Sequence, residues 1–297
     1  MNKNINELLR LRLSTKDSLK YFHQGTRDDP ELEILKCKKS GVIVLEKCKH
    51  NEDYYKNNKI YKNKDISMGS LKKNDPINKA QLQDDLNRFN SYKKIIKDKN
   101  YLDFGCCKGE LLKKSKGIAK YVAGVELEHD NRKELNKTGI DCFEYVTEIK
   151  DKKFDLVTLN HVFEHLSDPL KTIDDISNVM KKGALLIIEV PHARDILIEI
   201  FDSMEFKKFT FWSEHLILHT KQSLEKFLTY SKKFNCLEVQ GLQRYPITNH
   251  YYWLLKGKPG GHEHLKNIDD KEFHSQYEKY LDNFELTDSI VGFFKKK

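Results

Sequence analysis

The sequence lacks any long hydrophobic run. No apolar stretch approaches the roughly 20 residues that a membrane-spanning helix needs, and residues 1–10 contain no apolar core of a secretory signal. The chain also has no internal repeat and no long linker rich in Pro, Gly or Ser. We therefore expect a cytoplasmic protein without a membrane span, large enough for one main domain and a smaller attachment.

Cysteine is sparse and scattered. The six cysteines include no CxxC pair and form no disulfide-like array. Cys106 and Cys142 fall beside or within segments that we expect to be buried strands. Reduced thiols in a reducing compartment fit this pattern best.

Arginine is much less common than lysine, and the basic residues behind the net charge of +8 are spread along the chain. A basic balance can attract nucleic acid or other polyanions. The lysines here are spread among Asn and Ile, which is more typical of compositional bias than of a binding stripe. A mildly basic cleft also suits a small substrate that carries a diphosphate, so we expect a small molecule rather than nucleic acid as partner.

Predicted strands and helices alternate regularly through the middle of the chain. The strands are expected at 100–104, 120–127, 142–146, 154–159 and 184–190, and the helices at 109–116, 131–136 and 170–180. The runs 156–159 and 184–190 are rich in apolar residues and do not alternate with polar ones, as expected of strands covered on both faces. This alternation predicts an α/β fold with a parallel, doubly wound sheet.

Less regular segments lie on either side of this alternation. Residues 1–85 form an N-terminal extension with a predicted helix at 5–13, a hairpin within 33–46 and a polar, irregular stretch at 51–78. Residues 86–297 form the main domain, with a helical insertion at 192–232. Further helices are expected at 80–97, 195–201, 222–229 and 272–284, and a closing strand pair at 236–242 and 250–255.

A glycine turn follows the first strand of the alternating region. Residues 101–111 read YLDFGCCKGEL, so an apolar run ends in Asp103 and continues through Gly105 and Gly109. Glycines at the carboxyl end of a strand let the backbone approach a ligand closely. The spacing is neither the G-x-G-x-x-G of dinucleotide-binding folds nor a phosphate loop with Gly-Lys-Ser/Thr. It suits a ligand that places no phosphate at this turn.

The next strand-like run, residues 121–127, carries an acid near its end. Glu126 follows Gly124 and Val125. A carboxylate at this position can accept hydrogen bonds from both hydroxyls of a ribose. The turn and the acid together predict a sheet that binds a nucleoside.

With these residues the chain resembles a class I S-adenosylmethionine-dependent methyltransferase. The matching segments are LDFGCCKG at 102–109, GVE at 124–126, FDLV at 154–157, NHVFEHLSDP at 160–169 and KGALL at 182–186. The resemblance covers about residues 85–255. It implies a Rossmann-like, mostly parallel sheet of seven strands with an antiparallel last strand, and S-adenosylmethionine as cofactor with S-adenosylhomocysteine as product.

The resemblance also implies which residues contact the cofactor. Asp103 and Gly105 would line the methionine portion, with Cys107 and Gly109 in the same turn, and Glu126 would hold the ribose hydroxyls. The other positions are Leu127 at the adenine, Val146 and Thr147 at its edge, and Asn160 and His161 toward the sulfonium and the acceptor. The family usually has glycine where this chain has Cys107, whose side chain would crowd the turn.

Segments outside this core resemble methyltransferases of surface-polysaccharide and unusual-sugar pathways. They are RDDP at 27–30, FWSEHL at 211–216 and residues 253–261. This resemblance implies Arg27 and Trp212 as substrate contacts. Such enzymes often have an N-terminal zinc site of paired cysteines, which the isolated Cys37 and Cys48 do not reproduce, so we expect no metal.

In sugar methyltransferases of this kind a Glu-His pair in the insertion can remove the acceptor proton, and the matching residues are Glu214 and His215. Trp212 and Ser213 stand where a Tyr and a His often precede the pair. A sugar hydroxyl is a poor nucleophile at neutral pH, so a general base should help, and imidazole suits that role. We expect His215, oriented by Glu214, as the first candidate and His161 as the second.

Three alternatives stay open. Residues 161–165 spell H-x-x-E-H, a zinc-peptidase pattern, and His215 and His219 repeat its spacing. A nucleic-acid methyltransferase could stack a base on residues 251–253, although such a run is also typical of a half-buried strand. Cys107 is the best argument for a non-catalytic protein that retains the fold.

Overall fold

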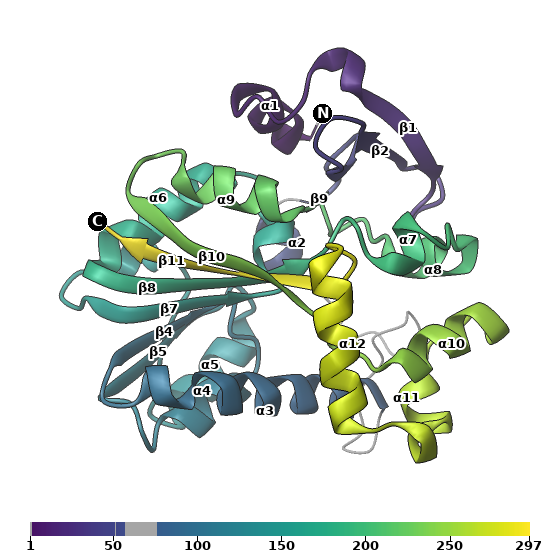
Figure 1. Cartoon of the computed structure of the whole chain (residues 1–297). Helices are drawn as coiled ribbons and strands as arrows, with labels where there is room; N and C mark the ends of the chain where they lie inside the picture. Colours follow the sequence, from purple (N-terminus) through teal and green to yellow (C-terminus); the bar gives the residue numbers. More distant parts are fainter. Residues whose placement is uncertain (1, 51, 57–75) are drawn as a thin grey trace. The chain divides into compact units, whose positions relative to one another are not determined.

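The computed structural model describes residues 2–50, 52–56 and 76–297, without the side chains of 76–81 (Figure 1). The chain divides into two compact units. The first comprises residues 1–49, 161–172 and 188–294, and the second comprises residues 50–160, 173–187 and 295–297.

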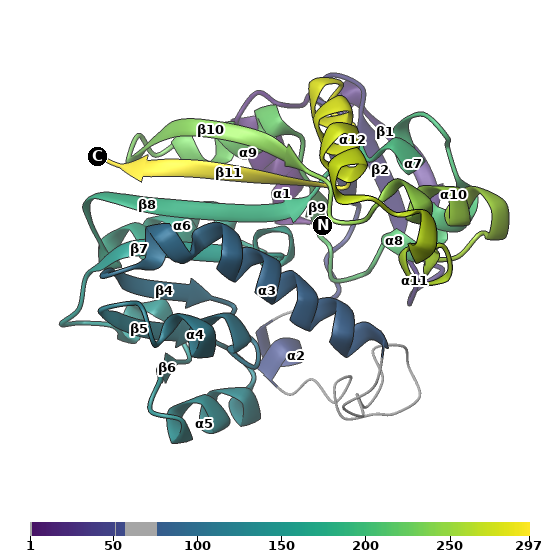
Figure 2. The same ribbon diagram turned by 60° about the horizontal axis from the view of Figure 1, so that its bottom comes forward.

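Seven strands form one sheet in the order β10-β11-β8-β7-β4-β5-β6. The strands are β4 (Asn100–Phe104), β5 (Tyr121–Val125), β6 (Asp141–Phe143), β7 (Phe154–Asn160), β8 (Met180–Pro191), β10 (Phe234–Leu242) and β11 (Ser289–Lys296). β4 pairs in parallel with β5 and β7, and β5 pairs in parallel with β6. The last strand, β11, runs antiparallel to β8 (Figure 2). The predicted mostly parallel, doubly wound sheet is confirmed.

Helices alternate with these strands as the sequence predicted. They are α3 (Pro76–Ile96), α4 (Glu110–Ser115), α5 (His129–Lys137) and α6 (Pro169–Val179). α3 packs against α4, and α4 and α5 pack against β5 and β6. Residues 156–159 are all buried in β7, so this strand is covered on both faces, as its run without alternation indicated.

The first unit contains a second sheet, of four antiparallel strands, in the order β1-β2-β3-β9. These are β1 (Leu19–Gln24), β2 (Glu33–Cys37), β3 (Ile43–Leu45) and β9 (Ile217–Leu218). β2 and β3 are the predicted hairpin. β9 comes from the insertion, so the N-terminal extension and the insertion form one structure. Ile34, Phe211 and Leu218 belong to the hydrophobic cluster of this unit.

The N-terminal helix α1 (Lys3–Arg10) belongs to the same unit and begins at a capping asparagine. The Asn2 side chain accepts from the Asn4 amide at 3.0 Å and donates to the carbonyls of Leu45 and Leu216. Accepting from a free amide at a helix start satisfies a donor that has no intrahelical partner. One buried side chain therefore connects the helix, the hairpin and the insertion.

The predicted closing strand at 250–255 is wrong. This segment is helix α10 (Ile247–Lys256), which ends at Gly257 in the left-handed conformation. Trp253 is buried against Phe206 and Phe209, with ring centroids 5.1 and 5.0 Å apart, while Leu255 is 74% exposed. One covered face and one exposed face are typical of a helix. β10 pairs instead with β11, which the sequence analysis did not predict.

Three of the remaining helices lie close to their predicted positions, and they are α7 (Ile196–Glu199), α9 (Lys221–Thr229) and α12 (Lys271–Asn283). The helices α8 (Met204–Thr210) and α11 (Gly261–His264) were not predicted. In the stretch expected to be irregular, residues 52–56 form helix α2 (Glu52–Lys56), and residues 51 and 57–75 lie outside the described part of the chain.

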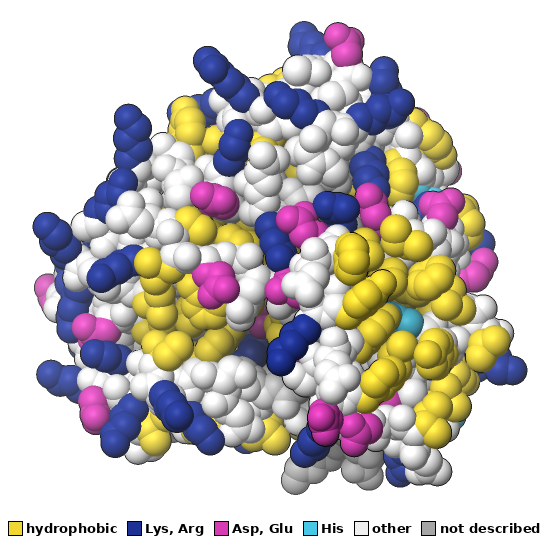
Figure 3. All heavy atoms as spheres, viewed as in Figure 1, with side chains coloured by type: hydrophobic (Ala, Val, Ile, Leu, Met, Phe, Trp, Pro, Cys, Tyr) yellow, Lys and Arg dark blue, Asp and Glu magenta, His cyan; other side chains and the backbone are white. Residues whose placement is uncertain are grey.

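The surface shows no single basic stripe on the face seen in Figure 3, where Lys and Arg side chains are dispersed. Hydrophobic side chains gather there over α10 and α12, which carry the exposed Leu254, Leu255, Phe273 and Tyr280. Among the described residues, no helix is both long enough and apolar enough to cross a membrane.

Candidate active site

The turn between β4 and α4 has an unusual backbone. Gly105, Cys107 and Gly109 have φ angles of 76°, 49° and 68°. Gly105 donates its amide to the Val125 carbonyl at 2.7 Å. A Cβ on Gly109 would lie 2.3 Å from a Leu135 methyl carbon. Gly105 and Gly109 therefore adopt this left-handed conformation without strain, whereas Cys107 adopts it at a cost.

Glu126 is held against this turn by backbone amides. Its Oε2 accepts from the Cys107 amide and its Oε1 from the Glu128 amide, both at 2.8 Å. Burial raises the pKa of Glu126, although the two amide donors act in the opposite direction. The oxygens keep further lone pairs. The carboxylate is thus oriented at the end of β5, where the ribose hydroxyls were expected.

Asp103 lies at the centre of a buried hydrogen-bond network. Its Oδ1 accepts from Thr158 Oγ1 at 2.6 Å and from Asn160 Nδ2 at 3.3 Å, and Tyr101 Oη lies 2.7 Å from Thr158 Oγ1. Burial raises the pKa of Asp103 to about 7, the Thr158 hydrogen bond opposes this, and the nearby Asp85 adds to it. The network brings the predicted Asp103 and Asn160 together and adds Thr158 and Tyr101, which the sequence analysis missed.

The expected adenine end lies beyond β5 and β6. Arg132 donates through Nη1 to the carbonyls of Glu126 and Leu127, at 2.8 and 2.7 Å, and through Nη2 to Glu144 at 2.8 Å. Arg132 thereby fixes the backbone at Leu127 and was also missed from the sequence. Val146 is buried, and it lies with Thr147 on a short 3₁₀ helix, Val146–Glu148.

His161 begins the segment after β7 and contacts two buried carboxylates. Its φ angle is 52°, and its amide donates to the Glu189 carbonyl at 2.8 Å. Its Nε2 lies 3.0 Å from Glu189 Oε1, and its Nδ1 lies 3.3 Å from Glu164 Oε1. Burial and Arg244 lower the pKa of His161, but the interactions with Glu164 and Glu189 outweigh them and raise it. The charged imidazolium is therefore favoured.

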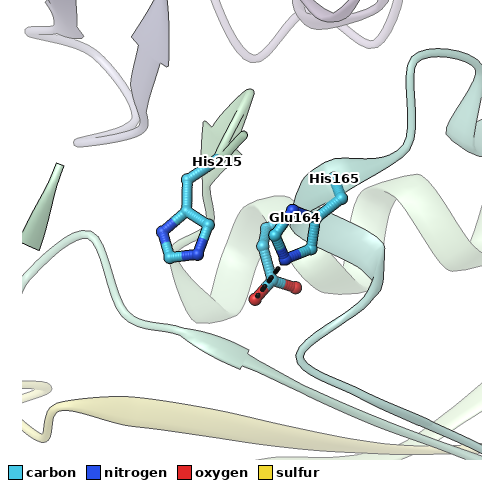
Figure 4. A group of neighbouring side chains, drawn as sticks. All are labelled: Glu164, His165 and His215. Atoms are coloured by element: carbon cyan, nitrogen blue, oxygen red, sulfur yellow. Dashed lines mark ion pairs between the residues drawn. The ribbon is translucent and has the colours of Figure 1, made fainter. Parts of the chain in front are cut away.

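Glu164, His165 and His215 form a compact cluster in the first unit (Figure 4). One possible ligand atom from each residue lies within 4.8 Å of the others. Glu164 and His165 are on a 3₁₀ helix, Phe163–His165, and His215 is on the insertion. His165 Nδ1 lies 3.0 Å from the Glu214 carbonyl oxygen, and the His165 and His215 ring centroids are 4.9 Å apart.

The charge states of this cluster differ from those of free side chains. Burial raises the pKa of Glu164, but His161 and the other nearby histidines lower it to about 2, so the carboxylate is ionised. Burial of its ring and the neighbouring His165 bring the pKa of His215 well below its usual range. His215 is therefore a neutral imidazole at neutral pH, with one nitrogen lone pair.

The residues of the H-x-x-E-H segment are not arranged as in a zinc peptidase. That pattern requires both histidines on one face of an α-helix, whereas residues 161–165 pass from a strand end into a 3₁₀ helix. His219 lies beyond β9 and contacts Ser223 Oγ through Nδ1 at 3.0 Å. The carboxylate grouped with His215 is that of Glu164, not that of Glu214. The backbone carbonyl oxygen of Glu214 contacts His165 Nδ1.

Arg27 and Trp212, predicted as substrate contacts from two distant segments, lie together. The Arg27 guanidinium carbon is 4.7 Å from the Trp212 ring centroid and 4.4 Å from that of Phe209. Asp28 accepts hydrogen bonds from the amide and the hydroxyl of Ser213, the amide at 3.0 Å. The RDDP and FWSEHL segments are therefore joined within the first unit.

Comparisons with known proteins give the family. A family profile described as a methyltransferase domain matches residues 76–231, more than half of the chain. Over 184 residues the chain is 26% identical to the ubiquinone biosynthesis O-methyltransferase of Glaesserella parasuis serovar 5 (strain SH0165), which covers 53% of this chain and 74% of the relative.

Two solved structures are similar to this one at low sequence identity. A SAM-dependent methyltransferase from Archaeoglobus fulgidus is 18% identical with a TM-score of 0.46, covering 72% of this chain and 94% of that one. The N-methyltransferase NodS from Bradyrhizobium japonicum WM9, in complex with S-adenosylhomocysteine, is 12% identical with a TM-score of 0.42, covering 75% and 89%. The family match shows that the chain belongs to the methyltransferase-domain family and is a methyltransferase that uses S-adenosylmethionine.

Proposed function

We propose that this enzyme methylates a hydroxyl of a small polar acceptor, a sugar or nucleotide-sugar of a surface-glycan pathway in the cytoplasm. The observation that carries the proposal is the pairing of Arg27 with Trp212 beside the His215 loop. A guanidinium held on an aromatic ring offers a fixed fork for phosphate oxygens. The relative named for ubiquinone biosynthesis is an O-methyltransferase, which supports oxygen as the methylated atom.

The chemistry follows from the cofactor. When bound, S-adenosylmethionine supplies a methyl group already activated by its sulfonium. The chain's own residues have to hold the acceptor oxygen in line behind that methyl, about 3 Å away, and receive the hydroxyl proton. We assign proton removal first to His215, whose imidazole is neutral and has a lone pair, although the burial that lowers its pKa also makes it a weaker base. His161 is the second candidate, although its pairing with Glu164 and Glu189 favours the form that has no lone pair.

A product screen tests the acceptor class. The purified protein is incubated with S-adenosylmethionine and, separately, with nucleotide-sugars, catechols and small amines, and products are identified by mass spectrometry. We expect S-adenosylhomocysteine together with a nucleotide-sugar that has gained one methyl group. Methylation of the catechols or the amines alone would refute the sugar assignment.

Variants test the assigned base. His215→Ala should lower kcat about 100-fold or more, the range of a lost general base, while S-adenosylhomocysteine affinity stays unchanged. His161→Ala should also lower turnover. His129→Ala, at an exposed position in α5, is the matched control. Full activity in both His215→Ala and His161→Ala would remove these residues from the mechanism.

A further inference from the structure

Glu164 is a buried carboxylate in an unusual setting. Its side chain is 0% exposed, and neither oxygen has a hydrogen-bond partner within the described part of the chain. Its Oε1 forms an ion pair with His161 Nδ1 at 3.3 Å. Buried carboxylates are paired, hydrogen-bonded or bound to a metal, and the ion pair with His161 leaves most of the acceptor capacity of Glu164 unused.

Two histidines, His165 and His215, lie beside Glu164. A carbonyl oxygen only accepts hydrogen bonds, so the contact with the Glu214 carbonyl places the proton of His165 on Nδ1. The other ring nitrogen of His165, Nε2, lies 3.8 Å from Glu164 Oε1. His215 Nδ1 is buried and has no hydrogen-bond partner among the described residues. One carboxylate and two imidazoles thus lie close enough together to share one cation.

We propose that Glu164, His165 and His215 bind one divalent transition-metal ion, for which Zn²⁺ is the best-suited occupant. Two imidazoles and one carboxylate form a donor set typical of zinc, whereas Ca²⁺ and Mg²⁺ prefer oxygen ligands. The donor atoms lie within 4.8 Å of one another, so a small closing movement brings each to about 2 Å from a shared ion.

Two further features suit a metal ligand set. The contact of His165 Nδ1 with the Glu214 carbonyl is the kind of outer hydrogen bond that orients metal-bound histidines. Glu164 is buried, while His165 and His215 are partly exposed as whole residues. Three protein ligands leave one position of a tetrahedral zinc site open, as in catalytic rather than structural sites.

The role of the ion rests on the proposed function. An acceptor hydroxyl that occupies the open position would have a lowered pKa and would release its proton to solvent. The oxygen would then form a bond to the methyl carbon as the carbon–sulfur bond breaks, which leaves S-adenosylhomocysteine. In this arrangement His215 serves as a ligand, and the ion takes over the activation that we assigned to His215 as a base.

Cobalt binding tests the site directly. The full-length protein is stripped with a chelator and titrated with Co²⁺, whose visible absorption reports coordination by protein ligands. Zn²⁺ is then added in competition, and bound metal is counted by mass spectrometry after dialysis. We expect one tightly bound ion per chain, displaced by Zn²⁺. Glu164→Gln and His215→Ala should each weaken binding about 100-fold or more, and His129→Ala should leave it unchanged.

The outcomes separate the metal site from the proposed function. Circular dichroism and S-adenosylhomocysteine affinity show that each variant is folded, and His165→Ala replaces any variant that is not. Absence of a bound ion, or equal binding by wild type and all folded ligand variants, overturns the site. Full methyl transfer to a nucleotide-sugar by the metal-free protein overturns only the catalytic role of the ion. Stoichiometric cobalt with no methylated sugar overturns only the acceptor.

Discussion

Replacing Cys107 by glycine should stabilise the protein through the backbone of the cofactor turn. Cys107 has a φ of 49°, and the left-handed conformation costs a residue with a Cβ about 1–2 kcal/mol. Glycine avoids this cost but loses roughly 0.5–1 kcal/mol more conformational entropy on folding. The difference leaves a net gain of about 0.5–1 kcal/mol, which corresponds to a rise in Tm of about 1–4 °C for a chain of this size.

Cys107→Ala is the matched control, because alanine removes the sulfur and keeps the Cβ. Thermal unfolding of the ligand-free protein should place Cys107→Gly above Cys107→Ala by that margin. All three forms retain the amide that donates to Glu126, so this hydrogen bond is common to the comparison. Equal stability of the two variants, or a more stable alanine variant, would refute the argument from backbone strain.

Calorimetric titration with S-adenosylhomocysteine measures the separate effect of the sulfur. The sequence analysis expects the Cys107 side chain to crowd the cofactor, so both variants should bind more tightly than the wild type. Burial raises the pKa of the Cys107 thiol, so the group stays protonated and the comparison is free of a change in charge. Weaker binding by both variants would show that the thiol contributes a favourable contact.

Three further predictions concern the same unit. Because burial raises the pKa of Asp103 to about 7 and the ligand's ammonium group favours the ionised carboxylate, affinity for S-adenosylhomocysteine should rise as pH rises through 7; calorimetry of Asp103→Asn should show no such slope. Thr158→Val removes the hydroxyl between Tyr101 and Asp103 and should lower the free energy of unfolding in urea by about 1–3 kcal/mol, and an unchanged value would contradict the network. Gly124→Ala would place a Cβ 2.5 Å from Cys106 Sγ and should cost about 1–3 kcal/mol in the same assay; adding Cys106→Ala should recover much of the loss, and no recovery would locate the strain elsewhere.

The alternating region was predictable because its signals are local. The apolar runs 156–159 and 184–190 indicated covered strands, and β7 and β8 contain them. α10 was mistaken for a strand because Tyr251, Tyr252 and Trp253 are residues that favour strands. Their helical conformation depends on the packing of Trp253 against Phe206 and Phe209, and that partnership between distant segments is not visible in the sequence.

The candidate site likewise contains residues that the sequence predicts and residues that it does not. Asp103, Gly105 and Glu126 could be predicted because each position follows from the end of a strand. Thr158 could not, because it lies beside Asp103 through the register between β4 and β7, and register is set by tertiary packing. The grouping of Glu164 with His215 likewise depends on where the insertion folds.

The small sheet has a consequence for biosynthesis. Its third strand, β3, ends at Leu45, and its partner β9 begins at Ile217. While the ribosome makes the intervening residues, the hydrogen-bonding edge of β3 has no native neighbour, and unpaired edges promote association between nascent chains. Fragments that stop before residue 217 should therefore aggregate during synthesis, and complete chains should close that edge themselves.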